Sequence, residues 1–283
     1  MCGIVGLFNQ SPDRSADNDS AIIAAMAGRI SHRGPDHQGV WQDDHLPLTL
    51  GHQRLSILDL SHHGHQPMLS NSGRYVLSYN GEIYNHKDIQ EELERAGIHL
   101  TGRSDTEALL AAIDKWGLAH ALQKINGMFA FSLWDRQEKN LTLVRDRMGK
   151  KPLYVGWLTP HHLAFTSEVK ALHSHDSFSG EIDRDVLAQF MRYGYVPAPL
   201  CIFKGFIQLL PGTLIRLDLE KPLPQSDLQK MIEPYWHHGQ VVEMARQKAP
   251  VTEEQAYADI KSLLKDAVKK RLISDVPVGS FLS

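Results

Sequence analysis

The chain is short of cysteine, of long apolar runs and of excess charge, and each shortage excludes a class of protein. Cysteine occurs only at Cys2 and Cys201 among 283 residues, which excludes a disulfide framework and favours a reducing cytoplasm. No apolar run approaches the roughly 18–20 residues that span a bilayer, and Met1–Phe8 lacks the pattern of a signal peptide. With 30 basic against 33 acidic residues, the net charge of −3 gives no basic excess for binding nucleic acid.

The remaining composition is that of an ordinary globular protein. Hydrophobic residues make up 42% and charged residues 22% of the chain, which is too apolar for disorder. The length suits one large domain, or one domain and part of another. A chain of this size buries enough surface to be stable without covalent cross-links.

The pattern of apolar residues predicts an α+β fold. Strand-like runs dominate both ends of the first 215 or so residues, and helix-like stretches are grouped between them, which favours two packed, mostly antiparallel sheets with helices outside. The expected strands are 3–8, 48–51, 55–58, 74–79, 83–84, 128–134, 141–145, 153–157, 163–166 and 212–219, and the expected helices are 19–30, 87–96 and 105–116. Asn80-Gly81 is expected to form a tight turn.

The composition changes after the last of these strands. We predict a first domain over 1–215, a proline-rich linker over 216–251 and the start of a second domain over 252–283. Thr252 would cap an amphipathic helix over 253–273, and a buried strand would begin at 276–282.

Cys2 is the first candidate for chemistry. The small residue behind Met1 permits removal of that methionine, which would give Cys2 a free α-amine with a pKa of about 7.7–8.0. A thiol nucleophile with its own base is the arrangement of N-terminal nucleophile hydrolases. The alternative is an ordinary cysteine in the first strand.

Four further residues are candidates for binding a substrate. Asn80 and the N–H of Gly81 could form an oxyanion hole, Arg54 could hold a carboxylate, and Asp105 could bind an ammonium. Their ordinary alternatives are a hairpin turn, a surface ion pair and a helix cap.

Three other features are interpreted as structural. His62, His63 and His65 have no acidic or cysteine neighbour at short spacing, so we expect no metal site. The run Gly64–Pro67 is expected to have a structural role, and Cys201 is expected to be a buried core thiol.

Seven motifs occur along the chain in a fixed order. They are MCGIVG at 1–6, HRGPD at 32–36, RLSI at 54–57, YNGEIYN at 79–85, SDTE at 104–107, MFAF at 128–131 and RDRMGKKPLY at 145–154. Together they resemble the glutaminase domain of the class II glutamine amidotransferases, and most closely that of the glutamine-hydrolysing asparagine synthetase family. The resemblance covers almost the whole chain.

The resemblance implies a particular architecture. It predicts a four-layer αββα N-terminal nucleophile hydrolase sandwich of two antiparallel sheets, followed by the beginning of an α/β ATP-pyrophosphatase domain. The segment 266–283 resembles the entry into that second domain, where Leu282 and Ser283 would begin the nucleotide-binding loop.

The resemblance also implies catalytic roles. Cys2 would attack the glutamine carboxamide, and its α-amine would act as base through a water. Asn80 and the N–H of Gly81 would form the oxyanion hole.

Further residues would bind the glutamine substrate. By resemblance, Arg54 would bind the α-carboxylate, Glu82 and Asp105 would recognise the α-ammonium, and Leu55 and Ile57 would complete the site together with the oxyanion pair.

The function implied is that of a glutamine-dependent asparagine synthetase. Glutamine would be hydrolysed through a thioester, without a cofactor, and the ammonia would pass to an aspartate activated by ATP and Mg²⁺, with release of AMP and diphosphate. The alternatives are amidation of a sugar carboxylate in polysaccharide biosynthesis and a non-catalytic glutamine-binding module. We expect small-molecule substrates, a homodimer as in relatives, no nucleic-acid or membrane partner, and glutamine hydrolysis without amide synthesis by this chain alone.

Overall fold

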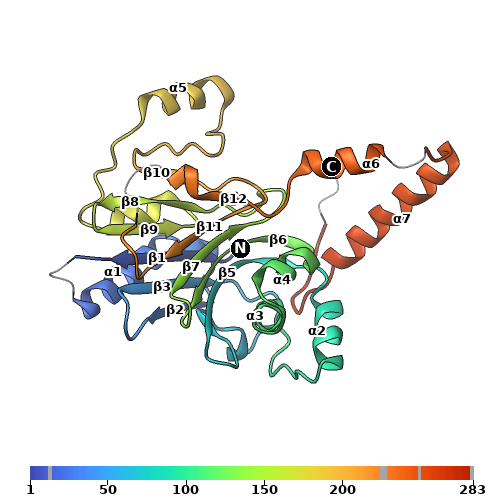
Figure 1. Ribbon diagram of the computed structural model, residues 1–283, viewed down its shortest axis with the longest axis horizontal. Coiled ribbons are helices and arrows are strands. Elements are labelled where there is room, and N and C mark those ends of the chain that lie inside the picture. Colours follow the sequence, from blue (N-terminus) through green and yellow to red (C-terminus); the bar gives the residue numbers. More distant parts are fainter. Residues whose placement is uncertain (12–14, 224–227, 248–249, 281–283) are drawn as a thin grey trace.

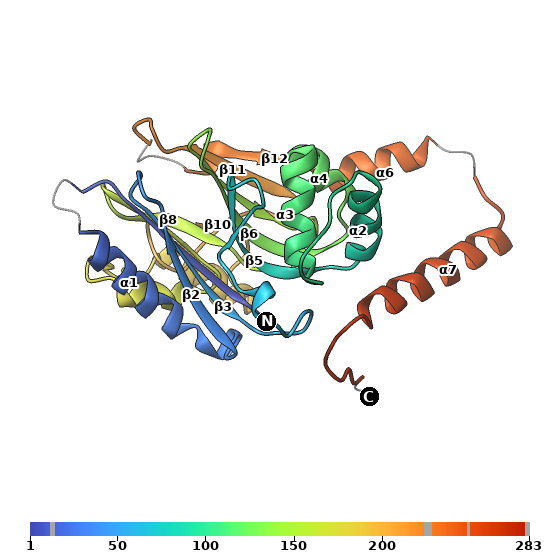
Figure 2. The same cartoon turned by 90° about the horizontal axis from the view of Figure 1, so that it is seen from below.

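A computed structural model describes residues 1–11, 15–223, 228–247 and 250–280. Two six-stranded sheets, with antiparallel pairing throughout, pack against each other, and helices cover their outer faces (Figures 1 and 2). The α+β sandwich that the sequence predicts is confirmed.

The strands of the two sheets come from different parts of the chain. The first sheet, in the order β10-β8-β9-β1-β3-β2, comprises β1 (Gly3–Asn9), β2 (His37–Gln42), β3 (Leu48–Arg54), β8 (Tyr154–Thr159), β9 (His162–Thr166) and β10 (Phe206–Gln208). The second, in the order β12-β11-β7-β6-β5-β4, comprises β4 (Met68–Leu69), β5 (Tyr75–Ile83), β6 (Gly127–Asp135), β7 (Asn140–Arg145), β11 (Thr213–Asp218) and β12 (Ile232–Pro234).

Some of the described helices cover the outer faces of the sheets, and others project from the sandwich (Figures 1 and 2). They are α1 (Ala16–Arg29), α2 (His86–Arg95), α3 (Asp105–Trp116), α4 (Leu118–Lys124), α5 (Arg184–Tyr193), α6 (His238–Arg246) and α7 (Glu253–Arg271). Helix α1 packs on the first sheet, and α2, α3 and α4 pack on the second. Among the described helices, none combines the length and the apolar character needed to cross a bilayer.

Every residue of β1 is buried because both faces of its sheet are covered. Ile4 and Phe8 point into the core between the sheets, whereas Val5 and Leu7 pack beneath α1. This alternation follows from the two-residue period of a strand. The central strand β1 therefore gives a rigid base to the residue in front of it, Cys2.

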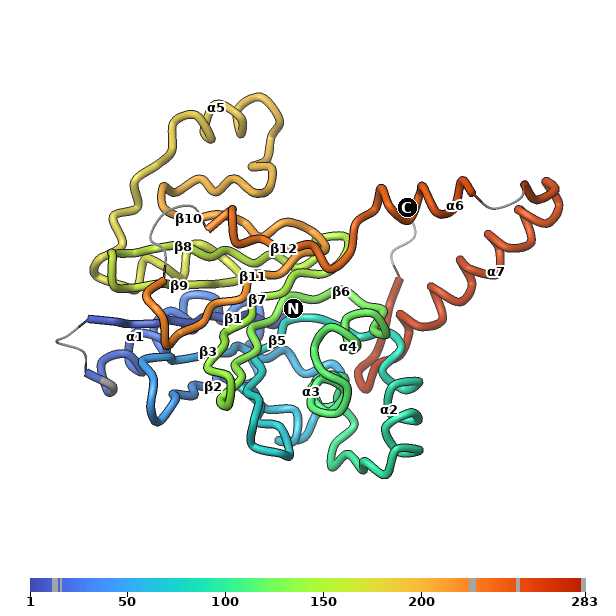
Figure 3. The backbone as a smooth tube through the Cα atoms, in the orientation of Figure 1, coloured from blue at the N-terminus to red at the C-terminus, as the bar shows by residue number. Residues whose placement is uncertain are grey.

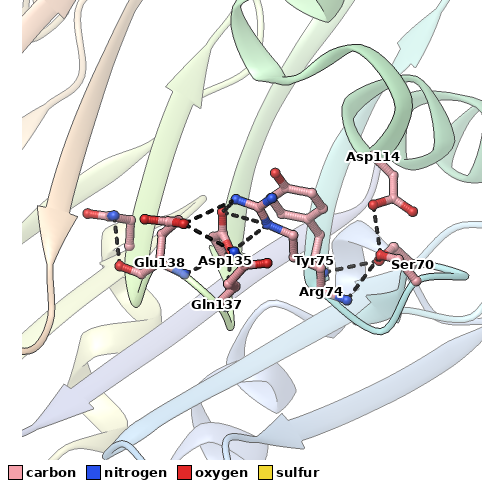
Figure 4. Close-up of polar contacts among 9 residues, drawn as sticks. Ser70, Arg74, Tyr75, Asp114, Asp135, Gln137 and Glu138 are labelled. Carbon is pink, nitrogen blue, oxygen red and sulfur yellow. Dashed lines mark hydrogen bonds and ion pairs between the residues drawn. The ribbon is translucent and has the colours of Figure 1, made fainter.

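The register of β5 against β6 is fixed at the end far from Cys2. Arg74 donates to Asp135 from Nε at 3.0 Å and from Nη2 at 2.7 Å, and Asp135 Oδ1 also accepts from the amide of Gln137 (Figure 4). Such bidentate pairs are geometrically specific. This register places Asn80 opposite Ala130.

The sequence prediction was wrong about Asn80-Gly81. Both residues lie inside the continuous strand β5, and Gly81 pairs with Phe129 rather than forming a turn. A Cβ at position 81 would lie 2.4 Å from the carbonyl oxygen of Met128. Glycine is therefore needed here because β6 approaches closely, and not because the backbone has a positive φ.

Three other expectations need correction. The chain leaves β3 at Arg54, so 55–58 is not a strand. The expected linker contributes β12, which pairs with β11, whereas the domain boundary itself stays a prediction. Residues 276–280 form no strand and are largely exposed, and Leu282, the end of that expected strand, lies outside the described residues.

Helix α7 begins at its expected residue with its expected cap, and it ends at Arg271, two residues before the expected end. Thr252 Oγ1 accepts from the amide of Gln255 at 3.2 Å. Helix α6 leads the chain away from the sandwich, and α7 runs back towards it (Figures 1 and 3).

Gly6 offers a test of the core packing. It pairs with Phe165 of β9, and a Cβ there would lie 2.0 Å from the phenyl ring, which is 1% exposed and cannot move away. We expect Gly6→Ala to lower the free energy of unfolding by ~1–3 kcal/mol because it overpacks the core. Gly28→Ala is the control, because a Cβ at this position of α1 meets nothing within 4 Å. This substitution should raise the free energy of unfolding by up to ~1 kcal/mol. Urea unfolding measures both, and a neutral Gly6→Ala would contradict the packing described.

Candidate active site

A pocket of about 170 Å³ collects residues from both sheets. The first sheet contributes Cys2, in front of β1, and Arg54, at the end of β3. The second contributes Asn80 from β5, and Asp105 begins helix α3. All eight glutamine-site residues expected from the sequence line this pocket, namely Cys2, Arg54, Leu55, Ile57, Asn80, Gly81, Glu82 and Asp105. The two expected nucleotide-binding residues, Leu282 and Ser283, lie outside the described residues.

The thiol of Cys2 is held by the loop that follows β3. Its Sγ accepts from the amide of Leu55 at 3.4 Å. Burial raises the pKa of the thiol, while the Leu55 amide, the nearby N-terminal amine and Lys151 act in the opposite direction. The thiol is therefore protonated at rest, and it needs a base before it can attack.

An N-terminal amine, carried in this structure by Met1, lies near the thiol of Cys2. Burial lowers the pKa of the Met1 amine, and the positive charges of Lys151 and Arg33 lower it further. Removal of Met1 would transfer this group to Cys2 itself.

Asn80 positions the backbone of Cys2. Its amide satisfies both neighbours in one orientation, in which the nitrogen donates to the Cys2 carbonyl oxygen at 3.0 Å and the oxygen accepts from Arg33 Nη2 at 3.3 Å. Arg33 Nε also donates to the Cys2 carbonyl at 2.9 Å. Because an amide nitrogen carries two protons, the second N–H of Asn80 remains for a ligand.

The direction of the Gly81 N–H follows from the pairing of β5. In an antiparallel ladder, alternate residues turn their N–H groups to opposite sides. Tyr84 donates to Asn126 on the β6 side, so residues 79, 81 and 83 face the other side. There the Tyr79 amide donates to Gln66 Oε1 at 2.7 Å and the Ile83 amide donates to Asp105 Oδ2 at 2.9 Å. Between them, the Gly81 N–H points into the pocket beside Asn80.

Asp105 joins α3 to this edge of β5. Its Oδ2 accepts from the Ile83 amide and, at 2.8 Å, from the hydroxyl of Tyr79. Ser104 caps the helix by accepting from the Glu107 amide at 3.2 Å, which confirms the expected helix start. Burial raises the pKa of Asp105, and these two hydrogen bonds offset part of that effect.

Glu82 is the second carboxylate of the pocket. Burial raises its pKa, the positive charge of Lys151 lowers it, and the negative charge of Asp105 raises it again. Two carboxylates that are partly destabilised in this way favour a ligand with a positive charge.

Arg54 presents a buried guanidinium to the same pocket. Nη1 donates to the Ser61 carbonyl at 2.7 Å and Nη2 donates to the Asp59 carbonyl. Gly64 leaves room for it, because a Cβ there would lie 2.0 Å from Nη2. The carboxylate of Asp59 is near enough to interact with this charge, but among the described residues Arg54 forms no ion pair, so its guanidinium can still bind an anion.

Sequence reasoning missed several residues of the site. Gln66, interpreted only as part of a structural run, does have a structural role, because it accepts from the Tyr79 amide and donates to Thr106. Lys151 is 3% exposed and lines the pocket. Its only signal was its place in the motif at 145–154. Arg33 was likewise hidden within the motif at 32–36.

Cys201 and the histidines near 62–65 were interpreted as structural from the sequence. Cys201 is 4% exposed and belongs to the core under α1, as expected. His65 stacks on His37 with ring centroids 3.6 Å apart, and among the described residues no three metal-ligating side chains of the His, Cys, Asp or Glu type cluster.

Comparison with known proteins places this geometry in context. Residues 1–236 match the family model described as a glutamine amidotransferase domain, and 259–283 match that of asparagine synthase. The chain is 35% identical over its full length to asparagine synthetase [glutamine-hydrolyzing] 1 of Bacillus subtilis, and 32% identical to the putative asparagine synthetase [glutamine-hydrolyzing] 2 of Methanocaldococcus jannaschii. It spans 42% and 54% of those proteins, respectively.

The fold has a counterpart among solved structures. The glutamine phosphoribosylpyrophosphate amidotransferase from B. subtilis superposes with a TM-score of 0.57, over 83% of this chain and 49% of that one. At 18% sequence identity, this likeness shows the shared fold alone.

Asp105 gives a prediction about stability and pH. Because its pKa in the folded state is raised, its contribution to stability is fully present below the unfolded pKa of about 3.9 and is lost as the pH rises through the folded pKa. We expect Asp105→Asn, whose amide oxygen can accept the same two bonds, to be more stable than the wild type at neutral pH, with an advantage that grows from about pH 4 up to the folded pKa and is constant above it. Urea unfolding at several pH values measures this advantage.

The exposed Asp44 supplies the control for this comparison. Within the part of the chain that the structure describes, it forms a single surface ion pair, with Arg136, so Asp44→Asn should change the stability little at any pH. If the stability advantage of Asp105→Asn did not change over this pH range, the raised pKa of the Asp105 carboxyl group would be contradicted.

Proposed function

Because the chain belongs to the glutamine amidotransferase domain family, we propose that it hydrolyses glutamine to glutamate and ammonia at this pocket. The observation that carries the proposal is the convergence, on one cavity, of a thiol beside an amine, a guanidinium that can bind an anion and two carboxylates with raised pKa values. These groups match a nucleophile, its base and the two charged ends of an α-amino acid.

Binding of glutamine would use the charged groups at opposite walls. Arg54 binds the α-carboxylate, and Asp105 with Glu82 binds the α-ammonium, while Leu55 and Ile57 flank the side chain. The ligand ammonium offsets the burial of the carboxylates, so substrate binding relieves a cost that the empty pocket bears. The carboxamide is thereby directed to Cys2.

The first chemical step forms a thioester. The α-amine, through a water, takes the proton of the Cys2 thiol, and the sulfur attacks the carboxamide carbon. The negative charge that develops on the carboxamide oxygen is stabilised by the free N–H of Asn80 and the N–H of Gly81. Collapse of the intermediate breaks the C–N bond, and the amine returns the proton to the departing ammonia.

The second step regenerates the thiol. The same amine takes a proton from water, which attacks the thioester carbonyl, and the oxyanion pair again stabilises the intermediate. Glutamate leaves, and the sulfur recovers its proton. This half-reaction needs no cofactor.

The role of the whole protein is a further part of the proposal. The ammonia passes to an aspartate activated by ATP and Mg²⁺, in a cytoplasmic and homodimeric asparagine synthetase whose nucleotide-binding loop begins at Leu282 and Ser283. The match of 259–283 and the names of the relatives support this role. A sugar carboxylate as acceptor and a non-catalytic glutamine-binding module are the alternatives.

Substitution of the nucleophile tests the central claim. We expect Cys2→Ala to lower kcat for ammonia release from glutamine by at least about a thousandfold, and Cys2→Ser to lose most activity, because a hydroxyl is the poorer nucleophile. Cys201→Ala is the matched control, since that thiol lies in the core, and it should keep the wild-type kcat. Bound glutamine without turnover in the wild type would instead favour the non-catalytic module.

The N-terminal methionine gives an independent test. We expect chains made while methionine aminopeptidase is inhibited to retain Met1 and to be inactive, because the nitrogen of Cys2 is then an amide without basic character. Intact mass identifies the two forms, and removal of Met1 from the same sample should restore ammonia release. Equal turnover by both forms would overturn the role of the amine.

A further inference from the structure

The chain returns from α7 to the rim of the glutamine pocket. The segment 271–275, called here the bridging segment, contacts both walls of that pocket. Asp275 bonds to the loop after β3, and Arg271 lies over the ring of Tyr84 at the end of β5. These contacts join parts of the sequence that are about two hundred residues apart.

The contact at the loop consists of two hydrogen bonds made by one residue. The amide of Asp275 donates to the Ile57 carbonyl at 2.9 Å, and Asp275 Oδ2 accepts from the Asp59 amide at 2.8 Å. Because the two bonds hold residues 57 and 59 from the same side, they fix the path of the loop between them.

Asp59 passes this constraint to the guanidinium of Arg54. Its carbonyl accepts from Arg54 Nη2, while its carboxylate accepts from the amides of Ser61 and Arg103. Its φ of +56° is a conformation that few residues other than glycine adopt. Such a conformation persists when surrounding hydrogen bonds determine it, and the bond to Asp275 is one of them.

The contact at the opposite wall lies beside the ammonium-binding carboxylates. The guanidinium of Arg271 is 4.2 Å from the centroid of the Tyr84 ring. Tyr84 directly follows Ile83, whose amide donates to Asp105. The bridging segment therefore spans the carboxylate-binding and ammonium-binding sides.

We propose that Asp275 is a positioning residue for glutamine binding, acting through Asp59 on the guanidinium of Arg54. The inference rests on the proposed function, because it assigns Arg54 to the α-carboxylate of glutamine. It makes the affinity for glutamine depend on a residue that follows α7 and lies outside the sandwich. Asp275 touches no reacting atom, so it governs binding of the substrate and not the chemical step.

Kinetics of three variants test this assignment. Asp275→Ala removes the acceptor and should raise KM for glutamine by about threefold to tenfold, with kcat changed less than about twofold. Asp275→Asn keeps an oxygen that can accept from the Asp59 amide, and should retain a KM near the wild-type value. Asp266→Asn is the matched control on α7, because among the described residues that carboxylate pairs with Lys270 alone, at the surface.

A binding measurement separates this proposal from the proposed function. In the Cys2→Ala background, which removes turnover, calorimetric titration with glutamine should show the same weakening for Asp275→Ala and the same retention for Asp275→Asn. Glutamine binding without ammonia release in the wild type would overturn the proposed function, and this titration would still decide the role of Asp275.

Two results would overturn the role of Asp275. One is an unchanged KM and Kd in Asp275→Ala. The other is an equal effect of Asp275→Ala and Asp266→Asn, which would show a general disturbance of the segment. Absence of both binding and turnover in the wild type would overturn both proposals together.

Discussion

The pocket depends on one buried carboxylate, that of Asp105. It accepts hydrogen bonds from the amide of Ile83 and the hydroxyl of Tyr79, and thereby fixes the start of α3 against an edge of β5 where no other strand of the described residues pairs. Without an acceptor at that place, two buried donors would be unsatisfied. The same carboxylate is costly to ionise, since burial raises its pKa. The fold therefore holds in place a carboxyl group whose ionised form a nearby positive charge would stabilise.

Local signals in the sequence were sufficient for most of the fold and for the glutamine-site residues. The apolar run at 3–8, the helix start at 105 and the short motifs depend on neighbouring residues, and the structure brings all eight expected residues to one pocket. The misread turn at Asn80-Gly81 has the opposite cause. Its local preference is overridden by a pairing with β6, about fifty residues along the chain, which no dipeptide can reveal.

Other parts of the site could not be predicted from the sequence because they consist of backbone N–H and C=O groups. The direction of the Gly81 N–H depends on which residues of β5 face β6, and thus on a register that Arg74 and Asp135 fix at the far end. The link from Asp275 to Arg54 likewise passes through a carbonyl and an amide of Asp59. Sequence patterns locate such residues without giving the direction of their backbone groups.

The open edge of β5 has a consequence for association between molecules. A row of unpaired amides on an edge strand is a template on which an extended segment of another chain can add. In the described part of the chain, β4 covers this edge only as far as Leu77, and beyond it Gln66 and Asp105 occupy the amides on either side of Gly81. The side chains that shape the pocket thus also protect the second sheet against strand addition and aggregation.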